Sequence, residues 1–301
     1  IEFAVAIFTN LTRDHLDYHA SFDDYLFAKR RLFDELKESA TAIVNAHDPA
    51  ATRMVDHCRA KIVRFGFDDS ADVRGRVLDE DANGTQFVLT GNGNSIELRL
   101  PLVGRHNVMN ALCSAAAGLA LGFDLPTVAR GLENLPQVPG RLQKVTTPDS
   151  NFAVFVDYAH TDDALRNVLA AIRPLTRGRL WCVFGCGGDR DKLKRPLMAK
   201  TVAELAEAFI ITSDNPRTED PLAIIEQIKA GLTPAELARG SVQPDRASAI
   251  DIAVSRLGEG DALIIAGKGH ENYQIVGMTK HHFDDVEVAT AAIEQHRKKG
   301  G

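Results

Sequence analysis

The sequence predicts an α/β protein with two domains, a mixed-sheet domain over 1–139 and a doubly wound parallel sheet over 140–301. Strand and helix patterns alternate through the second half, which is typical of a doubly wound sheet. Hydrophobic residues follow period two between 73 and 102, which predicts antiparallel hairpins. A segment rich in Pro and Gly at 136–140 predicts the domain boundary.

The composition narrows the class of protein. The chain has 301 residues, 45% of them hydrophobic and 25% charged, as in an ordinary globular protein. Its net charge of −6 argues against a nucleic-acid or membrane-surface partner. No apolar run reaches the ~18 residues that span a bilayer, and no signal peptide opens the chain. We expect a cytoplasmic protein without membrane insertion, and we expect it to be a monomer.

Four cysteines, Cys58, Cys113, Cys182 and Cys186, lie in mostly apolar surroundings. So few cysteines in a cytosolic chain favour reduced core thiols over disulfides. Cys182 and Cys186 flank the end of a strand with no His nearby, so we do not expect a zinc site.

In the first half, strand patterns cover 4–8, 42–45 and 62–67, and helix patterns cover 21–37, 107–121 and 126–135. Asn83-Gly84 and Asn92-Gly93 predict the tight turns of the hairpins. The strand at 4–8 begins without a preceding loop, although a parallel strand so early needs neighbours that earlier residues would supply. We therefore expect the chain to be the later part of a longer protein.

In the second half, strand patterns cover 152–157, 180–185, 209–212 and 263–266, and helix patterns cover 161–172, 196–207, 221–229 and 284–296. Polar or glycine residues end each strand, at 157–160, 185–190, 214–217 and 267–271. Open α/β sheets bind ligands at the carboxyl ends of their strands. We expect these four loops to form a single crevice.

The loop Asp214-Asn215-Pro216-Arg217 carries the strongest functional signal. Pro216 fixes its own backbone and holds Asn215 extended. The guanidinium of Arg217 presents a planar fork that binds a carboxylate with two parallel hydrogen bonds. A turn with a capping Asp214 and a solvated Arg217 is the alternative.

The other loops of the crevice add charges of both signs. The segment 185–192 is rich in Gly and charge but is neither a dinucleotide fingerprint nor a Walker A motif. Arg190 could bind a carboxylate or phosphate, and Glu271 could meet an ammonium group. The alternatives are a glycine turn that exposes Asp189 and Arg190, and a solvated Glu271. Asp157 and His160 could contact a ribose or a metal-bound water, or could simply cap the strand.

Three features of the first half suggest a nucleotide and a metal. Lys29 falls inside an apolar helical stripe formed by Phe22, Tyr25, Leu26, Leu32, Phe33 and Leu36. A buried lysine loses its charge, and a neutral amine can add carbon dioxide to give a carbamate that binds a hard cation; a lysine with its head in water is the alternative. His15, among acidic neighbours, suits a divalent metal or a solvated helix start. Asn107 and Asn110 face the same way on one turn and suit a base edge or an ordinary N-cap.

These segments occur together in one family. The runs 8–33 and 104–111 resemble the metal-and-lysine segment and the adenine-side helix of the Mur ligases. The last domain resembles that of the diaminopimelate-adding branch, at 140–141, 157–161, 185–196, 214–219 and 266–274. The resemblance covers nearly the whole chain. It implies a partial central ATPase domain followed by a Rossmann-like domain that binds the incoming amino acid.

The resemblance also implies an activity. In this branch an ATP-dependent acid–amino-acid ligase adds meso-diaminopimelate to UDP-N-acetylmuramoyl-L-alanyl-D-glutamate through an acyl phosphate, for peptidoglycan synthesis. By resemblance, His15 and carbamylated Lys29 serve Mg²⁺, and Asn107 and Asn110 lie by the adenine of ATP. Arg141 and Asp157 contact the nucleotide, with His160 near the phosphates. The residues that hold diaminopimelate would be Arg190, Asp214, Asn215, Pro216, Arg217, Gly267 and Glu271.

The chain departs from the family pattern in several places. The uridine-binding domain, the ATP phosphate loop and an acidic magnesium ligand are missing, and Val286 stands where an Arg is expected. We therefore expect the chain to be weak or inactive as a ligase by itself. The alternatives are a lysine-adding Mur ligase, a folylpolyglutamate synthase-like ligase, and a non-catalytic fragment that binds an amino acid. A nicotinamide dehydrogenase is disfavoured because no strand is followed by GxGxxG.

Overall fold

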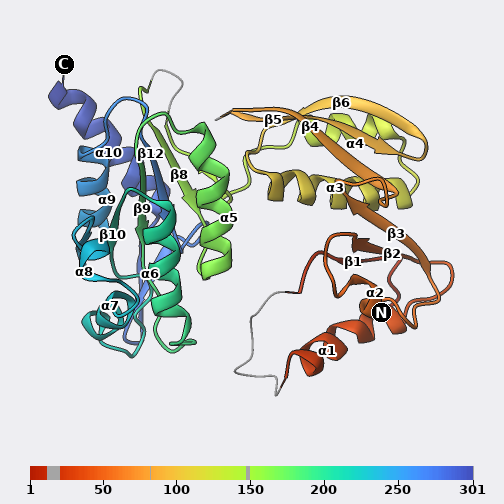
Figure 1. Cartoon of the computed structure of the whole chain (residues 1–301), viewed down its shortest axis with the longest axis horizontal. Coiled ribbons are helices and arrows are strands. Elements are labelled where there is room, and N and C mark those ends of the chain that lie inside the picture. Colours follow the sequence, from red (N-terminus) through yellow and green to blue (C-terminus); the bar gives the residue numbers. More distant parts are fainter. Residues whose placement is uncertain (12–20, 82, 147–149, 301) are drawn as a thin grey trace. The chain divides into compact units, whose positions relative to one another are not determined.

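A computed structural model describes the chain except for residues 12–20, 82, 147–149 and 301, and except for the side chains of 298–300. The chain divides into two compact units, Ile1–Pro136 and Gln137–Gly301. The division falls three residues before the boundary that the Pro- and Gly-rich segment predicts. Each unit is built around its own sheet (Figure 1).

The first unit contains a six-stranded mixed sheet in the order β1-β2-β3-β4-β5-β6. The strands are β1 (Val5–Phe8), β2 (Thr41–Asn45), β3 (Lys61–Gly66), β4 (Val73–Asp81), β5 (Gly84–Gly91) and β6 (Asn94–Leu100). Pairing is parallel from β1 to β4 and antiparallel from β4 to β6. Asn92 and Gly93 both have positive φ, 50° and 76°, as the tight hairpin turn requires. The predicted mixed sheet with antiparallel hairpins is confirmed.

Among its described residues, the first unit has four helices beside this sheet: α1 (Phe22–Asp34), α2 (Ala51–Met54), α3 (Arg105–Ala120) and α4 (Leu125–Glu133). The Ser21 side chain caps α1 by accepting a hydrogen bond from Asp24 N, at 3.1 Å. The apolar stripe of α1 is narrower than the sequence pattern predicts, because Leu26 and Phe33 are buried whereas Phe22 and Leu32 are exposed. The helix α3 packs against β2, β3 and β4 through its alanine-rich face.

The second unit contains a six-stranded sheet in the order β11-β10-β9-β12-β8-β7. The strands are β7 (Gln143–Lys144), β8 (Ala153–Asp157), β9 (Leu180–Phe184), β10 (Ala208–Ile211), β11 (Gly240–Val242) and β12 (Ala262–Ala266). All of them are parallel except β7. The central strands are buried on both faces, so they read as continuous apolar runs.

Helices cover both faces of this sheet, as a doubly wound fold requires (Figure 1). The helices are α5 (Asp162–Ile172), α6 (Lys194–Leu205), α7 (Pro221–Lys229), α8 (Pro234–Leu237), α9 (Arg246–Ser255) and α10 (Asp285–Gly300). Apolar residues of α9 and α10 pack against alternate residues of β8, β9, β10 and β12 to form one core. The helices α5 and α6 pack against each other. In addition, α5 packs against β12 and α6 packs against β10.

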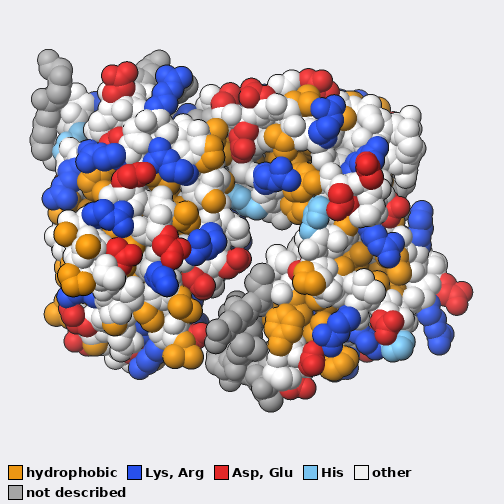
Figure 2. All heavy atoms as spheres, viewed as in Figure 1, with side chains coloured by type: hydrophobic (Ala, Val, Ile, Leu, Met, Phe, Trp, Pro, Cys, Tyr) orange, Lys and Arg blue, Asp and Glu red, His pale blue; other side chains and the backbone are white. Residues whose placement is uncertain are grey.

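The strand order brings the carboxyl ends of β8, β9, β10 and β12 to one edge. That the four loops form a single crevice stays a prediction. An antiparallel hairpin, β13 (Tyr273–Val276) and β14 (Thr279–His282), follows β12 and was not predicted. Basic and acidic side chains are interspersed on the face of the second unit that Figure 2 shows. All four cysteines are free thiols, as predicted. In the described part of the chain, no helix combines the length and apolar character needed to cross a membrane.

A fully buried ion pair ties α9 to α10 in the second unit. Arg246 donates from Nε and Nη2 to the two carboxylate oxygens of Asp285, both at 2.7 Å, and neither side chain is exposed. Arg246 Nη2 also donates to Ala266 O at 3.0 Å, at the end of β12. Breaking a buried pair leaves an uncompensated charge in a low-dielectric interior. The pair therefore holds the end of β12 in place.

We expect Arg246→Met to lower the free energy of unfolding of the second unit by about 3–5 kcal/mol, because Asp285 would remain buried without a partner. Trp181 is the single tryptophan of the chain and lies in the core of this unit, so its fluorescence reports the relevant transition in urea. The control is Arg166→Met, which removes an exposed pair with Glu204 and should cost less than about 1 kcal/mol. Equal losses in the two variants would contradict the role of the buried pair.

Candidate functional site

The four loops at the edge of the second sheet are joined by hydrogen bonds. Gly267 N donates to Asp157 O at 3.0 Å, and Gly188 N donates to Asn215 O at 2.8 Å. Asn215 Nδ2 donates to Glu271 Oε2 at 2.8 Å. Glycine permits the close approach, because a Cβ on Gly188 would lie 1.9 Å from the carbonyl oxygen of Pro216. The loops therefore form one continuous surface.

Lys268 lies at the centre of this surface and is fully buried. Its Nζ donates to Tyr273 O at 2.7 Å and to Asn215 Oδ1 at 3.0 Å, and it lies 3.2 Å from Asp214 Oδ1. Glu271 Oε2 is 4.0 Å from the same nitrogen. Burial lowers the pKa of Lys268, and the neighbouring Asp214 carboxylate opposes that shift. The ammonium lies among oxygen atoms from three different segments.

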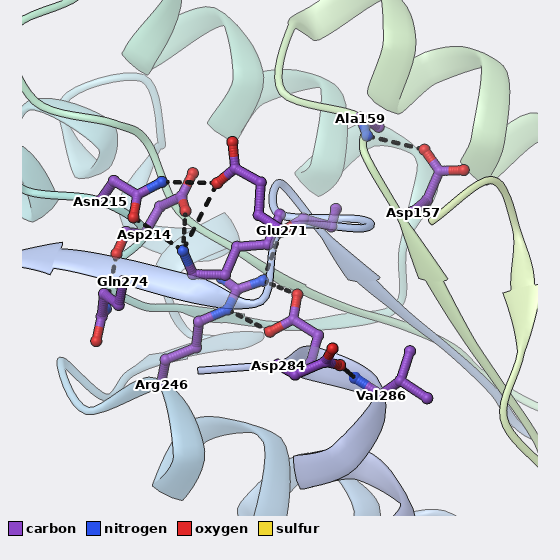
Figure 3. Close-up of polar contacts among 12 residues, drawn as sticks. Asp157, Ala159, Asp214, Asn215, Arg246, Glu271, Gln274, Asp284 and Val286 are labelled. Atoms are coloured by element: carbon purple, nitrogen blue, oxygen red, sulfur yellow. Dashed lines mark hydrogen bonds and ion pairs between the residues drawn. The ribbon is translucent and has the colours of Figure 1, made fainter. Parts of the chain in front are cut away.

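Figure 3 shows how Asp214, Asn215 and Glu271 converge. Asn215 Oδ1 accepts two hydrogen bonds, from Lys268 Nζ and from Ile275 N at 2.9 Å. The amide nitrogen of Asn215 therefore faces Glu271. Asp214 is buried, and its Oδ1 makes no hydrogen bond despite its ion pair with Lys268. The two carboxylates and one ammonium leave this cluster with an excess of negative charge.

Arg217 is held by the hairpin of β13 and β14. Its backbone has φ of 52°, a conformation that is unusual for a residue with a side chain. Arg217 N donates to Ile275 O at 3.1 Å, and Arg217 O accepts from Gly277 N at 2.7 Å. Gln274 Nε2 adds a bond of 2.7 Å to Asp214 O. These bonds hold the turn so that the half-buried guanidinium reaches Gly188 O at 2.8 Å.

A second buried cation, Arg195, forms hydrogen bonds with the loop after β9 and with the turn after β10. Arg195 is fully buried and donates to both carboxylate oxygens of Glu219, at 2.8 and 3.0 Å. It also donates to Gly187 O at 3.2 Å and to Gln227 Oε1 at 2.7 Å. The hydrogen bond from Arg195, with that from Asp189 N, lowers the pKa of Glu219 to about 2. Arg195 thus joins the loop after β9 to the turn after β10.

Two exposed residues of the loop after β9, Arg190 and Asp189, make different contacts. Arg190 is exposed, and its Nη1 donates to Asp189 O at 3.1 Å. Asp189 has φ of 53° and accepts hydrogen bonds from the backbone and hydroxyl of Thr218, at 3.2 and 2.8 Å. Asp189 therefore braces the turn that carries Arg217, while Arg190 extends into solvent.

Asp157 is committed to the backbone around it. Its carboxylate is buried and accepts from Leu142 N at 2.7 Å and from Ala159 N at 2.8 Å, the second of which is drawn in Figure 3. Burial raises the pKa of Asp157, and the two N–H donors oppose the shift. These contacts agree with the strand-cap alternative. His160 is half-buried, and its Nδ1 carries the proton because it faces Tyr158 O at 2.8 Å.

Two other predicted residues of the second unit, Arg141 and His160, lie beside the ring of Tyr158. The exposed Arg141 guanidinium lies 5.4 Å from the centroid of the Tyr158 ring. The His160 ring meets the same ring edge-on at 4.7 Å. Tyr158 N also donates to Gly140 O at 2.8 Å, so the aromatic ring is anchored where the second unit begins. Arg141 and His160 thus present two nitrogen groups beside one aromatic ring.

The first unit has a pocket of about 240 Å³ beside the start of α3. It is lined by Thr9, Asn10, Asn45, Phe65, Phe67, Arg105, His106, Met109 and Asn110. The guanidinium of Arg105 lies 4.2 Å from the centroid of the Phe67 ring. Aromatic rings, a guanidinium plane and amide groups are the partners that a planar heteroaromatic base requires.

The expectation that Asn107 and Asn110 face the same way is wrong. Asn107 is buried in the first turn of α3, and its Nδ2 donates to Val103 O at 2.7 Å. Asn110 is exposed and lines the pocket. The physical reason is that Asn107 lies on the side of α3 that packs onto the sheet.

The predicted metal residues are not brought together in the described part of the chain. Lys29 is exposed on α1, with its ammonium 5.0 Å from the centroid of the Tyr25 ring, so the alternative of a solvated lysine holds. His15 lies outside the described residues. Among the described residues, no group of three His, Cys, Asp or Glu side chains is arranged to hold a metal ion.

Sequence reasoning missed Lys268, Arg195 and Gln274. Lys268 is flanked by glycines, which is typical of an exposed loop, and Arg195 lies in a helix with charged neighbours. The one available signal was the fully apolar strand β12, which runs directly into Lys268. Val286, at the predicted departure from the family pattern, donates from its backbone to Asp284 Oδ1 at 2.8 Å (Figure 3).

Comparison with known proteins matches both units. Residues 1–118 match the Mur ligase middle domain, and 140–269 match the Mur ligase, glutamate ligase domain. The UDP-N-acetylmuramoyl-L-alanyl-D-glutamate--2,6-diaminopimelate ligase of Trichormus variabilis is 45% identical over 299 residues, covering 98% of this chain and 60% of that protein. The enzyme of the same name from Geobacillus kaustophilus is 43% identical over 300 residues, covering 98% and 61%.

Solved structures are also similar to this chain over nearly its whole length. A structure of a UDP-N-acetylmuramoyl-L-alanyl-D-glutamate--2,6-diaminopimelate ligase is 38% identical with a TM-score of 0.63, covering 99% of this chain and 61% of that one. MurF from Acinetobacter baumannii, at 18% identity and a TM-score of 0.72, covers 97% and 60% and shares the fold. The chain thus spans about three-fifths of the length of the relatives it matches.

The Arg195–Glu219 pair predicts a pH dependence of stability. The pKa of Glu219 falls from 4.5 to about 2 on folding, so its contribution is complete above pH 4.5 and is lost as the pH falls toward 2. We expect Glu219→Gln to lower the free energy of unfolding by about 3 kcal/mol at pH 7. The difference from the unaltered chain should shrink between pH 4.5 and 2, followed by Trp181 fluorescence.

The control for this prediction is Glu226→Gln, which removes an exposed partner of Lys229 and should change stability by less than about 1 kcal/mol. A Glu219→Gln difference that stays constant from pH 7 to pH 2 would show that the ionised pair does not stabilise the loops.

Proposed function

Because the chain belongs to the Mur ligase family, we propose that it carries part of the ATP-binding domain and the amino-acid-binding domain of an enzyme that adds meso-diaminopimelate to UDP-N-acetylmuramoyl-L-alanyl-D-glutamate. In the proposed reaction, ATP phosphorylates the D-glutamyl carboxylate. The amine of diaminopimelate attacks the acyl phosphate, an amide forms and phosphate leaves. The product is a peptidoglycan precursor, and the proposed location is the cytoplasm, where ATP is available.

The observation that carries this proposal is the arrangement of charges around the Asp214–Arg217 loop. The half-buried guanidinium of Arg217 uses one N–H on Gly188 O, and its planar fork has further donors for a carboxylate. Arg190 supplies a second guanidinium on the neighbouring loop. Glu271, which accepts a hydrogen bond from Asn215, and Asp214, which is paired with Lys268, supply negative charge. The far end of diaminopimelate carries one carboxylate and one ammonium, which these groups complement.

The same arrangement explains a preference over lysine. Lysine has the distal ammonium but lacks the distal carboxylate, so it would leave the guanidinium of Arg217 without a charged partner in the site. An unpaired buried polar group costs about 1–3 kcal/mol, which corresponds to roughly fivefold to over a hundredfold in affinity. The proposal therefore assigns selectivity for diaminopimelate to Arg217, with Arg190 as a second contact.

For the nucleotide, we propose that the pocket beside α3 holds the adenine of ATP. Phe67 and Arg105 offer a stacked pair of planes, and Asn110 offers an amide at the rim. Asn107 has a structural part in this proposal, because its amide is bonded to Val103 O. In the second unit, Arg141 and His160 are proposed to contact the ribose or phosphates, while Asp157 positions the backbone that carries them.

The family resemblance also suggests Mg²⁺ and a carbamate on Lys29. The described residues do not fit a metal centre, since Lys29 is solvated and no cluster of metal-binding side chains surrounds it. The charged side chains of the described site hold and orient the amino acid, and those contacts can be measured without ATP.

Calorimetry of meso-diaminopimelate with the purified chain tests the proposed ligand. We expect Arg217→Met to weaken binding by about tenfold to a hundredfold, because a charge-assisted bidentate contact is lost. Lysine should bind the unaltered chain more weakly than diaminopimelate, and Arg217→Met should not weaken lysine binding, because the unpaired guanidinium is then absent. The matched control is Arg256→Met, which removes an exposed arginine after α9 and should leave both affinities unchanged. Lysine bound as tightly as diaminopimelate by the unaltered chain would defeat the proposal.

A further inference from the structure

Lys268 is the one fully buried lysine among the described residues of the second unit, and it lies inside the proposed amino-acid site. Burying an ammonium is unfavourable unless ion pairs and hydrogen bonds compensate. Two hydrogen bonds, to Asn215 Oδ1 at 3.0 Å and Tyr273 O at 2.7 Å, and the ion pair with Asp214 at 3.2 Å supply that compensation. The lysine therefore has a single defined position in the folded chain.

The hydrogen bond to Asn215 has a consequence for Glu271. An asparagine amide can present either its oxygen or its nitrogen to a neighbour. Here Lys268 Nζ and Ile275 N both donate to Oδ1, which leaves Nδ2 to donate to Glu271 Oε2 at 2.8 Å. If Asn215 were reversed, its NH₂ group would face two donors and its oxygen would face a carboxylate. Lys268 thus stabilises the orientation in which Asn215 holds Glu271.

The charge of Lys268 also stabilises the position of Glu271. Its ammonium lies between Asp214 and Glu271, with Glu271 Oε2 4.0 Å away. Two carboxylates held this close would repel each other without an intervening cation. With one cation between two anions, the cluster retains one negative charge. The nearby Arg246–Asp285 pair is neutral as a whole, so it does not cancel that charge.

We propose that Lys268 is a positioning residue that orients the Asn215 amide and thereby aims the Glu271 carboxylate at the distal ammonium of the amino-acid ligand. The proposal rests on the proposed function, since it takes a diaminopimelate-like amino acid as the ligand. Lys268 itself is buried and does not touch the ligand. Its effect is selectivity: it favours compounds that carry an ammonium as well as a carboxylate at the far end.

Two ligands separate this role from simple structural support. The first is meso-diaminopimelate, and the second is 2-aminopimelate, which has the distal carboxylate but lacks the distal ammonium. We expect calorimetry on the unaltered chain to give tighter binding of diaminopimelate. In Lys268→Met, the affinity for diaminopimelate should fall at least about tenfold, to the level of 2-aminopimelate, because Asn215 no longer holds the Glu271 carboxylate toward the distal ammonium. The affinity for 2-aminopimelate should stay the same.

The outcomes are distinct. An equal loss for both ligands would mean that Lys268 only supports the fold, and no loss for either would mean that Glu271 does not depend on it; both results overturn the proposal. Failure of the unaltered chain to bind either compound would overturn the proposed function, and with it the ligand assigned to this cluster. Lys229→Met, on α7 outside the site, is the matched control and should change neither affinity.

A variant that misfolds does not end the test. Removing Lys268 alone leaves Asp214 buried without its cation, whereas Asp214→Asn combined with Lys268→Met removes both charges of the pair. Trp181 fluorescence shows whether each variant is folded. Measured against Asp214→Asn alone, the double variant should again lose its preference for diaminopimelate over 2-aminopimelate. A preference equal to that of Asp214→Asn alone would overturn the proposal.

Discussion

Burial of three cations beneath one edge of a parallel sheet is the constraint on which the second unit depends. Lys268 joins the loops after β10 and β12, Arg195 joins the loops after β9 and β10, and Arg246 joins β12 to α10. Each cation is fully buried, so each must keep its partners or leave a charge uncompensated. The loops consequently cannot move independently. The groups proposed to meet a ligand are carried on this fixed frame.

The fold could be read from the sequence because it follows from patterns that repeat along the chain. Apolar runs in β9, β10 and β12 mark strands buried on both faces, and Asn92-Gly93 marks a hairpin turn with positive φ at both residues. Parallel strands then bring their terminal loops to one edge. The buried cations could not be read in the same way, because a lysine or arginine is buried only when partners distant in sequence surround it. Asn215 and Lys268, for example, are separated by 53 residues.

The first unit shows that residue spacing within one helix predicts burial less well than the order of helices and strands predicts the fold. Six apolar residues between 22 and 36, five of them on α1, suggested a wide buried stripe that would include Lys29. On α1 only Leu26 and Phe33 are buried, and Lys29 is exposed. Likewise, spacing alone placed Asn107 and Asn110 together, although the sheet beneath α3 buries one and leaves the other at a pocket. Helical spacing gives the angle between two residues but not the direction of the protein interior.

The proposed amino-acid site contains two arginines: Arg217, which hydrogen bonds hold in place, and Arg190, which is exposed. This difference bears on which of them contributes more to selectivity. Arg217 has its backbone held by Ile275 and Gly277, and its guanidinium is bonded to Gly188 O, so little side-chain freedom remains to be lost on binding. Arg190 is exposed and would lose rotamer freedom on contacting a ligand, at a cost of about 0.5–1.5 kcal/mol. A carboxylate that reaches Arg217 therefore gains more free energy than one that reaches Arg190 alone. In the proposed site, selectivity for a distal carboxylate is therefore assigned to the turn that the hairpin holds, and selectivity for a distal ammonium to the Glu271 carboxylate that Asn215 holds.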